Sequence, residues 1–77
     1  MQLTKLLEYL SPGQGGRIVA IHAAEDFRRR LVALGLKPGN HIEVIRRGFF
    51  MGPLQVRIGT TDIIIRRCDA RHIEIAV

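Results

Sequence analysis

The stretch RRLVALGLKPG, residues 29–39, most constrains the fold because it makes a helix end at a defined residue. Gly35 fits the left-handed position that follows a helix, and Leu36 can then pack back on Leu31, as in a Schellman motif. The next four residues, KPGN at 37–40, have proline and glycine where a type II turn requires them. The chain is therefore predicted to leave a helix, turn and begin a strand within a few residues.

The helix that ends there has a clear apolar face. It is predicted over 24–34, with acidic residues in its first turn and apolar residues at helical spacing at Phe27, Leu31 and Leu34. The leucines of segment 3–10 also recur at helical spacing before SPGQGG, which contains strong helix breakers. We expect a short helix or a loose arm there.

Five short segments are rich in β-branched residues or alternate between apolar and polar side chains, which predicts strands. They are 17–22, 41–47, 54–58, 62–67 and 72–77. The sequence GTT separates the third and fourth as a tight hairpin would, and CDAR forms a short turn before the fifth.

These elements predict an all-β fold, a small SH3-like barrel of five strands with one short α-helix between strands 1 and 2. Closure of the barrel would remove the exposed edges of a five-stranded sheet. A five-stranded OB-fold is the alternative, but its helix usually lies between the third and fourth strands. Residues 1–77 contain no linker or repeat, so we expect a single domain.

Charge and cysteine content limit the partners and the compartment. The chain has 77 residues and a formal net charge of +5, which favours nucleic acid, an anionic membrane face or an acidic protein surface. Its single cysteine suits a cytoplasmic setting. We expect no signal peptide, and no apolar stretch approaches the roughly 20 residues of a membrane-spanning helix.

Four stretches of the sequence resemble the FeoA family of small cytoplasmic proteins from bacterial ferrous iron uptake. They are LSPGQGGRIVAI, RRLVALGLKPGNHIEVI, GPLQVRIG and IIIRRCDARHIEI, which together cover nearly all of the chain. The helix ending in LGLKPG, followed by a GP before a strand, is the most specific part. The same SH3-like unit also forms the C-terminal domain of iron-dependent repressors, but without a helix-turn-helix region ahead of the unit in this sequence we expect a free-standing domain.

The resemblance implies an SH3-like fold and an accessory role, docking on the cytoplasmic side of the FeoB transporter with its GTPase domain and tuning iron uptake. It implies no catalytic residues and no cofactor. The chain departs from the family at Phe49 and Phe50, where members often carry proline or small residues. The loop around them is therefore more apolar than expected.

The loop RRGFFMGP places Phe49, Phe50 and Met51 between two strands, flanked by glycines. Leaving such side chains in water forgoes roughly 1.5–3 kcal/mol of burial for each. They either fold over the barrel mouth as a lid or form an exposed contact for a transporter or a second copy of the chain. We take the contact as the hypothesis for partner binding.

The arginine run on the helix is a second candidate. Successive helical residues point in different directions, so only some of the run can face one acidic partner, and we select Arg29 and Arg30. The paired arginines 46–47 and 66–67 are expected to bond to Glu43, Asp62 or Glu74. The functional alternative is a small nucleic-acid-binding barrel or a detached SH3-like domain of an iron-dependent regulator. Nucleic-acid barrels usually interleave basic and aromatic residues on a sheet face, a pattern this sequence lacks.

Metal binding and catalysis are not expected. A metal site needs three or four convergent ligands, and of His22, His41, His72 and Cys68 only the last two are near in sequence. The glycines of GQGG lack the lysine and the helix of a phosphate-binding loop. The protein is therefore predicted to act by contact, without a cofactor and without an enzymatic reaction.

Overall fold

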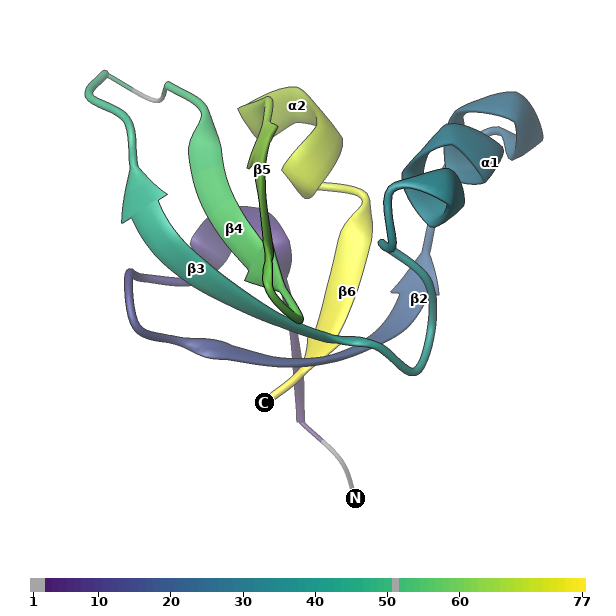
Figure 1. The fold of residues 1–77 in the computed structure, drawn as a ribbon, viewed down its shortest axis with the longest axis horizontal. Coiled ribbons are helices and arrows are strands. Elements are labelled where there is room, and N and C mark those ends of the chain that lie inside the picture. The colour runs from purple at the N-terminus through teal and green to yellow at the C-terminus, as the bar shows by residue number, and fades with distance from the viewer. Residues whose placement is uncertain (1–2, 51) are drawn as a thin grey trace.

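The structure is a computed structural model that describes residues 3–50 and 52–77. Within this part of the chain it contains one antiparallel sheet of six strands, two α-helices and one 3₁₀ segment (Figure 1). In chain order these are β1 (Thr4–Leu6), η1 (Leu7–Tyr9), β2 (Gly15–Ile21), α1 (Glu25–Ala33), β3 (His41–Arg47), β4 (Leu54–Ile58), β5 (Thr61–Ile65), α2 (Arg67–Ala70) and β6 (Ile73–Ala76). None of the described helices is both long and apolar enough to cross a bilayer.

The sheet curls strongly but does not close, so the prediction of a closed five-stranded barrel is wrong. The strand order is β1-β6-β2-β3-β4-β5, and no ladder among the described residues joins the edge strands β1 and β5. Register shifts at Val19 in β2 and Ile45 in β3 insert one extra residue each. Such bulges bend a strand and increase its twist, which curls the sheet around its core without closure.

The strand count and the helix position also differ from the prediction, because the chain has an additional N-terminal strand. Residues 4–6 pair with β6, and the amide of Val77 donates to the carbonyl of Leu3 at 3.0 Å. The 3₁₀ turn η1 follows at once and buries Leu7 and Leu10. Helix α1 therefore lies between the second and third strands, where the sequence places it between the first and second.

The predicted helix stop is confirmed. Gly35 has φ of 97°, its amide donates to the carbonyl of Val32 at 2.9 Å, and the amide of Leu36 donates to the carbonyl of Leu31 at 2.9 Å. These two bonds define a Schellman motif. The KPGN turn follows with Gly39 at φ of 97° and a hydrogen bond from Asn40 to Lys37. The Asn40 side chain also donates to the Gly35 carbonyl at 2.8 Å, and this bond ties the end of the turn to the end of the helix.

The core lies inside the curl of the sheet and draws on every element except β1. Its fully buried members alternate along the strands, as the sequence pattern predicts for strands with one buried face. The buried set is Leu7, Leu10, Ile18, Ile21, Leu31, Leu36, Ile42, Val44, Leu54, Val56, Ile65, Ala70, Ile73 and Ile75. Helix α1 contributes only Leu31 and the half-buried Phe27, so most of its surface faces away from the core.

An ion pair on the β4–β5 hairpin makes stability depend on pH. Arg57 donates to both carboxylate oxygens of Asp62, at 2.7 and 3.2 Å, and Gln55 donates at 3.0 Å. The bonds from Arg57, and secondarily from Gln55, hold the pKa of Asp62 below its ordinary 3.8. The folded state therefore binds this proton less tightly than the unfolded chain. The stability it contributes is present above pH 3.8 and is lost as the pH falls below that value.

Replacement of this carboxylate should change the pH dependence of unfolding. We expect Asp62→Asn to lower the urea midpoint near neutral pH and to leave it close to that of the parent at pH values below the folded-state pKa. The two midpoints should converge on acidification, as measured by fluorescence or circular dichroism. A constant difference between the parent and the variant at every pH would contradict the assignment.

Candidate interaction site

The loop between β3 and β4, described at residues 48–50 and 52–53, extends beyond the ends of these two strands (Figure 1). Its backbone is held by two hydrogen bonds, from the amide of Gly48 to the carbonyl of Pro53 at 2.8 Å and from the amide of Gly52 to the carbonyl of Phe49 at 3.0 Å. A side chain at Gly52 would lie 2.9 Å from the Phe49 carbonyl oxygen, so the narrow base of the loop requires glycine. Hydrogen bonds therefore hold the described residues on both sides of the loop together.

The loop presents its aromatic side chains to solvent. Phe49 is 91% exposed and Phe50 is 101% exposed, so neither folds over the sheet as a lid. Phe50 has φ of 53°, the left-handed region that few residues other than glycine, asparagine and aspartate adopt. Met51, the third residue predicted for this contact, lies outside the described residues. The sequence left two interpretations open for the phenylalanines, a lid over the barrel mouth or an exposed contact. In the structure both side chains are exposed.

A shallow basic hollow adjoins the base of this loop. It has a volume of about 440 Å³ and is lined by Gly52, Pro53, Arg66, Arg67, Cys68 and Arg71. Arg66 donates to Asp69 at 3.0 Å, and this bond raises the pKa of the Arg66 guanidinium further above its ordinary value. Arg67 lies 3.8 Å from the carboxylate of Glu8. The loop and the hollow together form a surface with an apolar tip and a cationic base.

Arg47 fixes the root of the loop. Its guanidinium Nη1 donates to the carbonyl oxygens of Glu8 and Leu10, at 2.7 and 2.6 Å. These carbonyls lie at the end of η1, where a helix leaves acceptors without partners. The predicted bonding of the arginine pairs to Glu43, Asp62 or Glu74 is therefore wrong: Arg66 and Arg67 lie beside other carboxylates, and Arg46 makes no side-chain bond with the described residues. The bonds of Arg47 could not be predicted from the sequence, because backbone carbonyls carry no residue-specific signal.

The two arginines predicted on the helix lie far from the phenylalanines. Arg29 and Arg30 belong to α1, which occupies the opposite end of the long axis from the β3–β4 loop in Figure 1. Arg29 is bonded to Glu25 at 3.1 Å, one helical turn earlier. The four described residues that the sequence assigned to partner binding therefore do not form one patch.

The histidines and the cysteine are dispersed. His22 is bonded to Glu74 at 2.7 Å, and this bond lowers the pKa of the Glu74 carboxyl. The exposed Cys68 lies 3.7 Å from the Asp69 carboxylate. Over residues 3–50 and 52–77, no three side chains of His, Cys, Asp or Glu gather where they could hold a metal ion.

Comparison with solved structures identifies the fold. A crystal structure of an iron uptake regulatory protein, FeoA, superposes with a TM-score of 0.88 at 28% identity, over 96% of this chain and 97% of that one. FeoA of Stenotrophomonas maltophilia, complexed with zinc and described as a prokaryotic SH3 domain protein and a candidate ferrous iron transport activating factor, superposes with a TM-score of 0.73 at 25% identity, over 95% and 86%. A manganese-dependent transcriptional repressor superposes with a TM-score of 0.88 at 19% identity, over 99% of this chain and 42% of that one, which shows the fold alone. No curated protein matches the sequence.

The open, curled antiparallel sheet with its short helices is that of the small SH3-like β proteins. The FeoA domain model matches residues 5–77, nearly the whole chain, and the structural matches agree with it. The chain belongs to the FeoA family. It is thereby associated with ferrous iron transport, and the predicted family and SH3-like fold are confirmed.

Proposed function

We propose that this protein is a cytoplasmic accessory protein of bacterial ferrous iron uptake that binds the FeoB transporter and modulates it. It acts by contact and without a reaction of its own. The family membership supports the role in iron transport. The contact is assigned to the β3–β4 loop because Phe49 and Phe50 are almost fully exposed on a backbone that two hydrogen bonds hold in place.

Physical arguments support this choice of surface. Aromatic side chains are enriched among the residues that contribute most to protein–protein binding. A turn that is already ordered loses little conformational entropy on binding, so more of the burial energy appears as affinity. The arginines beside the loop would surround the apolar contact with positive charge, which favours an acidic rim on the transporter.

The test is retention of the protein by the cytoplasmic domain of FeoB. We expect the double variant Phe49→Ser, Phe50→Ser to bind at least about 30-fold more weakly than the parent, since removal of two central aromatic contacts costs about 2 kcal/mol or more. The unfolding midpoint should not fall, because neither side chain is buried. The readout is titration calorimetry or affinity capture with purified domain.

Leu3→Ser is the matched control. Leu3 is 70% exposed, and its carbonyl accepts a hydrogen bond from the amide of Val77 just after β6, so it does not belong to the β3–β4 loop. Its replacement should leave the affinity unchanged. Equal binding by the parent and the double variant would remove the loop from the contact, and an equal loss in Leu3→Ser would point to general adhesion of exposed apolar groups.

The nucleic-acid alternative has less support in the structure. Phe27 packs against the core, and Phe49 and Phe50 lie in one loop instead of along a basic sheet face. The similarity to the manganese-dependent transcriptional repressor shows the fold alone, so it does not support nucleic-acid binding by this chain. Affinity for a single-stranded oligonucleotide that falls with a log–log salt slope of about −0.7 per phosphate contact would favour this alternative.

A further inference from the structure

Strand β2 has an unpaired edge beside helix α1. Its pairing with β3 covers Gly15 to Arg17 and ends with the backbone bonds between Ile18, Gly39 and Asn40. On the opposite edge, pairing with β6 continues to Ile21. Beyond Ile18, no strand among the described residues pairs with β2 on this side; Val19 is the extra residue of the bulge, and alternation along the strand points the backbone groups of Ile21 to the open edge. An unpaired strand edge presents amides and carbonyls that another chain can pair with.

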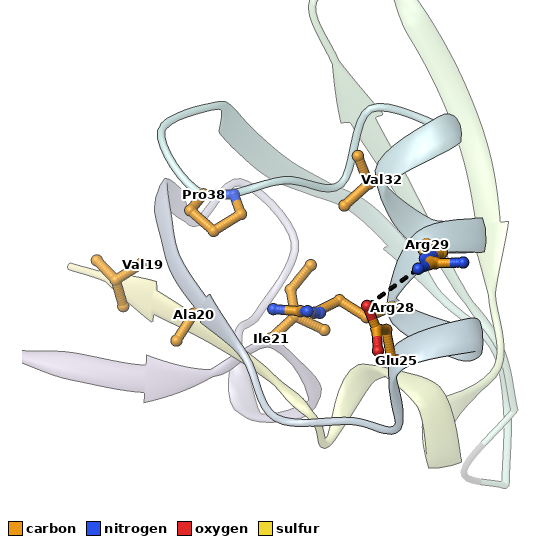
Figure 2. Close-up of a pocket in the computed structure, with 8 residues that line it drawn as sticks. All are labelled: Val19, Ala20, Ile21, Glu25, Arg28, Arg29, Val32 and Pro38. Atoms are coloured by element: carbon orange, nitrogen blue, oxygen red, sulfur yellow. Dashed lines mark hydrogen bonds and ion pairs between the residues drawn. The ribbon is translucent and has the colours of Figure 1, made fainter.

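A groove of about 410 Å³ lies along this edge. Figure 2 shows its two walls, β2 on one side and α1 on the other, with the turn at Pro38 closing one end. Its lining residues are Val19, Ala20, Ile21, Glu25, Arg28, Arg29, Val32 and Pro38. The walls provide apolar contacts, since Val32 is exposed on the helix at 39% and lines the groove with Pro38.

The charge of the groove selects an acidic occupant. Arg28 and Arg29 both line it, against the single carboxylate of Glu25. Arg29 is bonded to Glu25 at 3.1 Å, whereas Arg28 makes no side-chain hydrogen bond or ion pair with the described residues. Figure 2 shows the Arg28 side chain extending from α1 toward Ile21 of β2. A carboxylate on a bound peptide would meet this guanidinium close to the strand edge.

We propose that this groove, defined by β2 residues 19–21 and the Arg28–Val32 face of α1, binds an extended acidic segment of a partner protein by strand addition. The segment pairs with the open edge of β2, places apolar side chains against Val32 and Pro38, and pairs a carboxylate with Arg28. The contact is separate from the phenylalanine loop and does not depend on the function proposed for that loop.

The test uses a defined probe, an acetylated and amidated hexapeptide of alternating glutamate and valine, titrated into the ¹⁵N-labelled full chain. We expect saturable shifts of the amides in 19–21 and 28–32. Hydrogen exchange of the Ile21 amide, which points to the open edge, should slow at least about tenfold in the complex. Absence of shifts in these segments at millimolar peptide would overturn the proposal.

Two modified peptides separate strand addition from charge attraction. Methylation of alternate backbone nitrogens removes the donors needed for a ladder and should weaken binding at least about tenfold. A version with lysine in place of glutamate should lose saturable shifts. Unchanged affinity of the methylated peptide would overturn strand addition, and unchanged affinity of the lysine version would overturn the acidic assignment.

Two protein variants complete the test. Arg28→Glu should bind the acidic peptide at least about tenfold more weakly with an unchanged unfolding midpoint, because Arg28 is exposed. The Phe49→Ser, Phe50→Ser variant should bind the peptide like the parent. Equal binding by Arg28→Glu, or displacement of the peptide signal to the phenylalanine loop, would contradict the site. The phenylalanine variant also distinguishes failure of this proposal from failure of the FeoB contact.

Discussion

Gly16→Ala should leave most of the protein unfolded at ambient temperature. A β-carbon at this position would overlap the carbonyl oxygen of Ala76 in the adjacent strand β6 and lie 3.0 Å from a methyl of Ile75. The carbonyl belongs to the backbone of a paired strand, so it cannot move aside without breaking the ladder between β2 and β6. We expect a cost of about 3 kcal/mol or more, comparable to the whole stability of a domain of this size.

Circular dichroism and urea unfolding of the purified variant would measure this loss. Gly59→Asn is the matched control because no atom lies within 4 Å of a β-carbon there, and its φ of 62° lies in the left-handed region that asparagine tolerates. The control should remain folded with a midpoint near that of the parent. A folded Gly16→Ala protein with a parental midpoint would mean that β2 and β6 do not approach as closely as the structure places them.

Arg47→Met should cost about 2–3 kcal/mol and loosen the root of the β3–β4 loop. The substitution keeps most of the aliphatic stem but removes the donor for the carbonyls of Glu8 and Leu10, which then remain half-buried without that partner. Hydrogen bonds from a charged donor are worth more than neutral ones, and an unsatisfied acceptor carries its own desolvation cost. The loss should also separate η1 from the end of β3.

Urea unfolding measures this effect as a lower midpoint with an unchanged slope. Arg46→Met provides the comparison, since the Arg46 side chain is exposed and makes no hydrogen bond or ion pair within the described residues. The free energy of unfolding of Arg46→Met should stay within about 0.5 kcal/mol of that of the parent. Equal destabilisation by the two substitutions would assign the effect to lost charge instead of the two carbonyl bonds.

The strands and the helix stop could be predicted because their determinants are local. Strands β3 and β4 begin and end at the predicted residues, since alternation and the flanking turn residues mark both ends. The Schellman motif at Gly35 depends on a glycine and on two leucines in its immediate neighbourhood. Each of these elements carries its own signal in a window of about ten residues.

The N-terminal segment and the open sheet could not be predicted, because they depend on distant backbone contacts. The spacing of the leucines in 3–10 fits a helix equally well, and only pairing with β6, about 70 residues later, selects a strand. Whether a curled sheet closes depends on its bulges at Val19 and Ile45, which the sequence does not mark with glycine. Strand count and barrel closure were therefore beyond a local analysis.

The contact at the phenylalanine loop stays a prediction from the sequence. The apolar run between glycines indicates a loop contact at Phe49 and Phe50, and their exposure agrees with that interpretation. The groove beside α1 was missed because Arg28 is one of three adjacent arginines, and nothing local indicates that it faces the open edge of β2. The position of Arg28 beside the open edge of β2 arises only when the sheet has folded.

The central claim is that the phenylalanine loop docks on the cytoplasmic domain of FeoB. The most direct measurement is titration of that unlabelled domain into the ¹⁵N-labelled protein. We predict the largest shifts or line broadening at Gly48, Phe49 and Phe50, extending into the adjoining turn at 66–71, with no change in β1. Perturbation confined to β1 or to α1, or an unperturbed loop at concentrations where the transporter retains the protein, would contradict the account.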